Sequence, residues 1–181
     1  QIIREYGESE DKPQFGDIYN LEILSLHEWG HSFVNPALEK YRQQVRALDK
    51  LFIPVKERMA QMAYPEVEIF FNEQVLRASE LLGTKDLYGE LEYARRLEIE
   101  TLYGFYLTEF TVEQLKHYQA HRDQYPDFVQ FVPYLLEQYK QHQEELISLV
   151  QEAKEFEIKE VKIKAAYWPG DGGIETLSPR Y

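Results

Sequence analysis

The sequence predicts a mainly α protein, and three features of the chain support this. Apolar residues recur at the three- and four-residue spacing of amphipathic helices from about residue 18 to residue 154. The two-residue alternation typical of a strand occurs only later, in FEIKEVKIK. With 181 residues, of which 44% are hydrophobic, the chain is long enough for one core and too short for two. We therefore expect a lead-in segment over 1–17, a helical domain over 18–154, and a β strand or hairpin with a C-terminal linker over 155–181.

The central segment is predicted to hold six helices. Pro36 biases Asn35 away from helical dihedrals, Pro54 marks a kink or break, and Gly83 suits a left-handed helix end. Thr111 is a suitable residue to open the fifth helix. The expected ranges are 18–34, 36–64 with a break at Pro54, 65–83, 90–110, 111–125 and 126–153.

Charge and composition exclude several classes of function. The net charge of −12 repels a phosphate backbone, so a nucleic acid is not an expected partner. No apolar run is long enough to cross a bilayer. The chain has no cysteine, which excludes disulfides and thiolate ligands and leaves His, Asp, Glu, Ser and Tyr to carry any chemistry.

The stretch LSLHEWGHSFVNP contains an HExxH motif within a predicted helix. His27 and His31 are four residues apart, so their imidazoles lie on one face and can bind one tetrahedral zinc ion. Glu28 lies about 100° around the helix from His27, which is the position of a general base for a metal-bound water. Gly30 leaves room for a neighbouring element, and Trp29 is expected to pack away from the metal. The alternative is an amphipathic helix with two polar core residues.

A catalytic zinc ion needs a third protein ligand. No third histidine follows the motif closely, so a glutamate on a later helix is the expected ligand. Glu73 lies among apolar residues in FFNEQVLRAS, where Asn72 and Arg77 could orient its carboxylate. An exposed Glu73 paired with Arg77 is an equally good interpretation of the spacing. Other acidic residues that could serve instead are Glu80, Glu98 and Glu100.

Other polar residues are weaker candidates. His117 and His121 also lie four residues apart, but their neighbours are charged and favour surface histidines over a second metal site. His142 is isolated and is interpreted in the same way. Tyr103 or Tyr106 could donate a hydrogen bond to an oxyanion, although aromatic core packing is the favoured role for each.

Together, HEWGHSFVNP, FFNEQVLRAS and YGFYL...YPDFVQFVP resemble the bacterial DUF4932 family, which looks like a gluzincin-type zinc metallopeptidase. The similarity covers most of residues 20 to 140. The resemblance implies a zincin-like helical domain in which His27, His31 and Glu73 bind one zinc ion and Glu28 is the base. Zincins normally have a sheet before this helix, whereas only about two dozen residues precede His27, so an N-terminal sheet is expected to be missing.

The expected function is zinc-dependent hydrolysis of peptide bonds, with a peptide or protein as substrate. The alternatives are a non-catalytic helical binding or scaffold domain with a structural or vestigial metal site, and a metal-free interaction module. The C-terminal YWPGDGGIETLSPRY is similar to the entry of an Ig-like module common in extracytoplasmic bacterial proteins, which favours an extracytoplasmic or secreted location.

Overall fold

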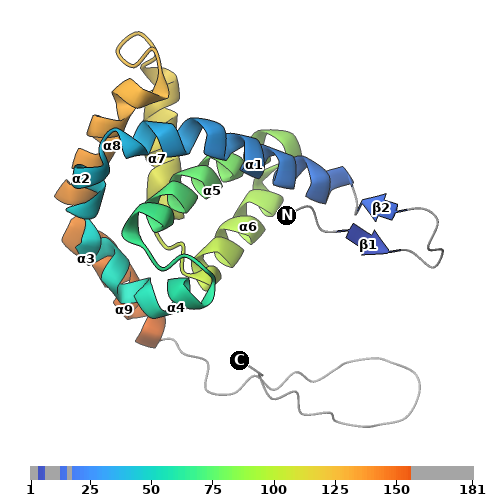
Figure 1. Cartoon of the computed structure of the whole chain (residues 1–181), viewed down its shortest axis with the longest axis horizontal. Helices are drawn as coiled ribbons and strands as arrows, with labels where there is room; N and C mark the ends of the chain where they lie inside the picture. The colour runs from blue at the N-terminus through green and yellow to red at the C-terminus, as the bar shows by residue number, and fades with distance from the viewer. Residues whose placement is uncertain (1–3, 7–12, 16–17, 156–181) are drawn as a thin grey trace.

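The fold is mainly α, as the sequence predicts, with the helices packed around one central helix (Figure 1). The computed structural model describes residues 4–6, 13–15 and 18–155, and the side chains of residues 24–150. The central helix is α5 (Val67–Tyr88), which contacts α1, α2, α3, α6 and α7. The β strand or hairpin predicted for 155–181 lies outside the described residues, except that Glu155 ends α9.

Two short strands precede the first helix. Strand β1 (Arg4–Tyr6) pairs antiparallel with β2 (Pro13–Phe15), with Arg4 opposite Phe15. The expected lead-in segment thus contains a small two-stranded sheet. Strands of three residues are too short to show the alternation that identifies a strand in a sequence.

Helix α1 (Ile18–Glu39) carries the HExxH motif and extends beyond its predicted end at residue 34. Pro36 lies inside the helix, so the prediction that it ends the helix is wrong. Pro36 and Ser32 are both exposed, and the Ser32 carbonyl that loses its helical partner can therefore be hydrated. The added turn contains Ala37 and Leu38, whose burial in the core favours continuing the helix.

The second predicted helix is a series of short segments. They are α2 (Arg42–Arg46), α3 (Asp49–Phe52), the 3-10 helix η1 (Ile53–Val55) and α4 (Lys56–Gln61). Pro54 lies in η1, which agrees with the break predicted there. Apolar side chains of these segments are buried against the rest of the core, notably Val45, Leu51 and Met59.

The predicted end of α5 at Gly83 is also wrong. The helix continues to Tyr88 and ends at Gly89, which has φ +85°. Thr84 is buried beyond Gly83, so tertiary packing holds the last turn in helical form. Helix α6 (Glu90–Tyr103) ends earlier than predicted, at Gly104, which adopts the left-handed conformation that glycine tolerates.

The last three helices in the described part of the chain are α7 (Thr108–Ala120), α8 (Phe128–Gln141) and α9 (Gln143–Glu155). Helix α7 starts three residues before the predicted Thr111, whose hydroxyl instead bonds the Leu107 carbonyl. The sixth predicted helix is divided at His142, and Pro133 lies inside α8. Asp127 caps α8 by accepting a hydrogen bond from the Gln130 amide at 2.9 Å.

Aromatic side chains fill the core around α5. Phe71 packs edge-on against Tyr139 of α8 with ring centroids 5.2 Å apart, and Phe70 stacks on Phe105 at 6.3 Å. The buried Gln74 amide nitrogen donates to Thr108 Oγ1 at 2.7 Å. This packing makes α5 a rigid support for the polar side chains it carries. Among the described helices, none has the length and apolar character needed to span a membrane.

Candidate metal centre

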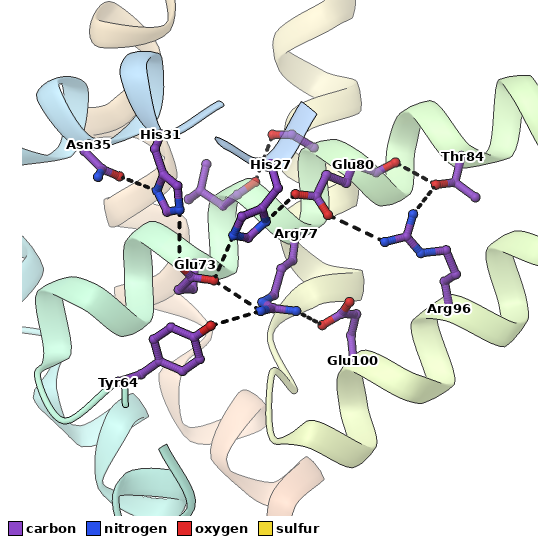
Figure 2. A network of polar contacts seen from close by, with 12 residues as sticks. His27, His31, Asn35, Tyr64, Glu73, Arg77, Glu80, Thr84, Arg96 and Glu100 are labelled. Carbon is purple, nitrogen blue, oxygen red and sulfur yellow. Dashed lines mark hydrogen bonds and ion pairs between the residues drawn. The ribbon is translucent and has the colours of Figure 1, made fainter. Parts of the chain in front are cut away.

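The centre lies where α1 crosses α5. Gly30 lies so close to α5 that a Cβ atom built on it would be 2.1 Å from Leu76 Cδ1. The prediction that Gly30 admits a neighbouring element is therefore confirmed, and the element is α5. This close contact places the histidine face of α1 directly over the polar residues of α5 (Figure 2).

His27 and His31 point from α1 toward Glu73 of α5 (Figure 2). His27 Nε2 is 3.6 Å from Glu73 Oε2, and His31 Nε2 is 3.5 Å from Glu73 Oε1. Ligand atoms of the three residues all lie within 4.8 Å of one another, so the group could hold a metal ion. Residues 46 positions apart in the chain thus meet as the DUF4932 resemblance implied.

The other ring nitrogens of the two histidines have their own partners. His27 Nδ1 donates to Glu80 Oε1 at 2.6 Å, and His31 Nδ1 donates to Asn35 Oδ1 at 3.2 Å. Because both acceptors are oxygen atoms, Nδ1 carries a proton in each ring and the lone pair of the neutral imidazole lies on Nε2. Metal-binding histidines are usually oriented in this way.

Glu73 is almost fully buried, with 5% of its side chain exposed. Arg77 Nη2 lies 3.2 Å from Glu73 Oε2, but Oε2 accepts no well-aligned hydrogen bond. Arg77 offsets part of the cost of burying the Glu73 carboxylate, but Oε2 still lacks a hydrogen-bond donor, and a second cation beside the histidines would supply the missing interaction. The donor set therefore fits a metal ion.

Arg77 is itself held from several sides. Its Nη1 donates to Glu100 Oε2 at 2.8 Å, its Nη2 to the Tyr64 hydroxyl at 3.4 Å, and its guanidinium lies 4.1 Å from the Phe105 ring centroid. Burial lowers the pKa of Arg77, but the carboxylates of Glu100 and Glu73 outweigh this and leave it raised. Arg77 thus stays charged beside Glu73.

The pKa of His27 is raised above its ordinary value, mainly by the hydrogen bond to Glu80. Burial opposes this increase, and the negative charges of Glu80 and Glu73 add to it. The same carboxylates that favour a proton on His27 would favour a metal cation at its Nε2.

Glu28 and Trp29 of the motif are on the surface. Glu28 is exposed on α1, one residue beyond His27, and Trp29 is 70% exposed. Of the other acidic residues considered, Glu80 bonds His27 Nδ1 and Glu100 bonds Arg77, so both contact residues of the centre without joining the ligand group. Glu98 is exposed.

The weaker candidates lie elsewhere. His117 and His121 are half-buried and stacked with ring centroids 3.9 Å apart, so they are not simple surface residues. His142 is also half-buried and packs against Phe110. Tyr106 is a core residue bonded to the Leu51 carbonyl, while Tyr103 is 51% exposed, which contradicts its predicted core packing.

Two residues that support the ligands are not indicated by the sequence pattern. Asn35 lies beyond the predicted end of the first helix. Because α1 continues past that point, Asn35 lies four residues from His31 on the same face and accepts a hydrogen bond from its Nδ1. Arg96, from α6, lies 3.5 Å from Glu80 Oε2, and no local pattern indicates this contact.

The fold and site define a mainly α protein with a candidate metal centre made by an HExxH helix and a glutamate from a second helix. Residues 5–138 match the family described as Domain of unknown function (DUF4932). The match spans more than half of the chain, so this chain belongs to the DUF4932 family. No curated protein and no solved structure matches the chain.

Proposed function

We propose that the chain is a gluzincin-like zinc peptidase in which His27, His31 and Glu73 hold one zinc ion and Glu28 is the general base. The observation that carries this proposal is the convergence of the two histidine Nε2 atoms on a buried carboxylate, while both Nδ1 atoms contact other oxygen atoms. An ordinary polar contact between helices does not need both imidazoles oriented in this way.

The donor set supports zinc and a catalytic role. Two imidazole nitrogens and one carboxylate oxygen are the protein ligands of many catalytic zinc sites, which keep a further position for water or substrate. The side chains of His27 and His31 are 17% and 28% exposed, whereas Glu73 is 5% exposed. Solvent and substrate would therefore approach from the side of α1.

The proposed mechanism uses Glu28 for proton transfer. A bound zinc ion would supply Lewis acidity toward the attacking water and the scissile carbonyl. Glu28 takes a proton from the water as it attacks and gives that proton to the leaving amine, so the net reaction consumes one water and breaks one C–N bond. The exposed position of Glu28 beside His27 leaves its carboxylate accessible to a peptide.

Two measurements on the parent chain and the Glu28→Gln variant test the proposal. Zinc per chain is measured by elemental analysis after mild purification, and cleavage of a peptide library is followed by mass spectrometry. We expect about one zinc per chain in both proteins, with cleavage by the variant at least about 100-fold slower. Because Glu28 is exposed, the substitution should leave the fold intact.

A variant that keeps zinc and cleaves as fast as the parent would remove Glu28 from the mechanism. A parent chain that binds zinc and cleaves nothing would instead support a scaffold domain with a structural or vestigial metal. A chain that takes up no zinc would support a metal-free interaction module.

A further inference from the structure

Helix α6 contacts both residues that hold the metal ligands in place. Arg96 Nη2 lies 3.5 Å from Glu80 Oε2, and Glu80 in turn bonds His27. One turn further along α6, Glu100 accepts a hydrogen bond from Arg77, which lies beside Glu73. Figure 2 shows both series of contacts reaching from α6 through α5 to the centre.

Of these two α6 side chains, Glu100 is buried and Arg96 is half-buried. The side chains of Arg96 and Glu100 are 13% and 8% exposed, and Arg96 also donates to Thr84 Oγ1 at 3.0 Å. Buried ion pairs contribute little to stability, because desolvation offsets most of the attraction between the charges. Stability alone therefore does not explain why α6 turns two opposite charges toward α5.

We propose that Arg96 and Glu100 are positioning residues of the metal centre, which couple the docking of α6 to metal affinity. This inference rests on the proposed function, since it assumes that His27, His31 and Glu73 bind zinc. Arg96 holds Glu80 against His27 Nδ1, and Glu100 holds Arg77 beside Glu73. Both contacts keep ligand side chains oriented before the metal arrives, which reduces the entropy lost on binding.

Positioning and simple electrostatics predict different results for the two residues. Neutralising Glu100 makes the surroundings more positive and should weaken zinc binding in either case. Neutralising Arg96 makes the surroundings more negative, so electrostatics alone predicts tighter binding. If Arg96 acts by holding Glu80, its loss should weaken binding instead.

The experiment measures the zinc dissociation constant of the full chain by competition with a chromophoric chelator. The variants are Arg96→Met and Glu100→Gln, with Glu98→Gln as the matched control because Glu98 is exposed on the same helix. We expect both test variants to weaken zinc binding about three- to tenfold, less than the roughly 10–100-fold typical of losing a direct partner of a ligand. The control should bind as the parent does.

Two further measurements separate positioning from a general loss of stability. The effect of Arg96→Met should disappear in a Glu80→Gln background, because the residue it acts through is already altered. The absorption bands of the Co²⁺-loaded chain should change in both test variants and not in the control. If a test variant fails to fold, Arg96→Lys and Glu100→Asp take its place, with smaller shifts in the same direction.

The proposal is overturned if Arg96→Met binds zinc as tightly as the parent or more tightly, or if its effect persists unchanged without Glu80. This failure differs from failure of the proposed function. The proposed function fails if the parent chain itself binds neither zinc nor Co²⁺, or if it binds zinc and cleaves no peptide.

Discussion

Glu80 Oε1 lies 2.6 Å from Nδ1 of His27, although the two residues are 53 positions apart in the chain. This hydrogen bond fixes both the orientation of the imidazole and the position of its proton. Because Nδ1 carries the proton, Nε2 faces Glu73 with its lone pair free. The contact thus connects the packing of α1 on α5 to the chemistry of the centre.

Replacing Glu80 by Gln should weaken zinc binding. Gln can still accept the hydrogen bond from His27, but it lacks the negative charge that makes the imidazole a stronger ligand. We expect the zinc dissociation constant to rise about tenfold or more, measured by chelator competition. Glu98→Gln, which neutralises an exposed carboxylate, should bind zinc as the parent does; equal affinities for all three proteins would show that Glu80 does not act on His27.

Replacing Glu73 by Gln should abolish stoichiometric zinc uptake. The substitution keeps the shape of the side chain and removes the charged ligand, while Arg77 still contributes positive charge beside the site. Affinity should fall by more than the roughly 10–100-fold caused by losing a residue that only orients a ligand. Elemental analysis of the purified variant checks this, and near-stoichiometric zinc in it would exclude Glu73 as a ligand.

The pKa of His27 predicts opposite effects of pH on the metal-free chain and on metal binding. Because the folded-state pKa is raised above 6.5, the contact of protonated His27 with Glu80 stabilises the metal-free fold fully below pH 6.5. This contribution is lost as pH rises through the folded-state value. Zinc affinity should increase over the same range, since the metal competes with the proton.

Denaturant unfolding of the chelator-treated parent and of His27→Gln, compared at several pH values, measures the contribution of His27. The stability difference between the two proteins should shrink as pH rises above 6.5. A difference that grows with pH would contradict the raised pKa.

Gly30 and Gly83 should respond in opposite ways to alanine. At Gly30 a methyl group would collide with the buried Leu76, so Gly30→Ala should destabilise the fold by about 1–3 kcal/mol. Gly83 lies inside α5 with nothing within 4 Å of a built Cβ, so Gly83→Ala should stabilise by about 0.5–1 kcal/mol. Chemical unfolding of the parent and the two variants measures these changes. If Gly30→Ala were as stable as the parent, α1 and α5 could move apart at that point with little loss of stability.

Local patterns predicted the helical regions well and their ends poorly. Proline and glycine are usual boundaries, yet α1 continues through Pro36 and α5 through Gly83, because buried residues beyond each of them favour another helical turn. Because the predicted helix ended at residue 34, the contact between Asn35 and His31 was not predicted. A spacing of four residues places two side chains together only when both lie in one helix.

For the centre, spacing within α1 was enough to propose that His27 and His31 share a ligand, because four residues correspond to about one helical turn. The sequence also placed Glu28 beside them. It left Glu73 undecided between a ligand and a surface ion pair, and only the resemblance to DUF4932 favoured the ligand.

The sequence by itself determined the helical class of the protein, the shared face of the two histidines and the family to which the chain belongs. The tertiary structure decided that Glu73 is buried opposite those histidines, that Glu80 orients His27, and that α6 supplies Arg96 and Glu100 behind them. The reason is physical: helical periodicity is local and can be read along the chain, whereas the face that α5 turns toward α1 depends on side-chain packing among residues distant in sequence.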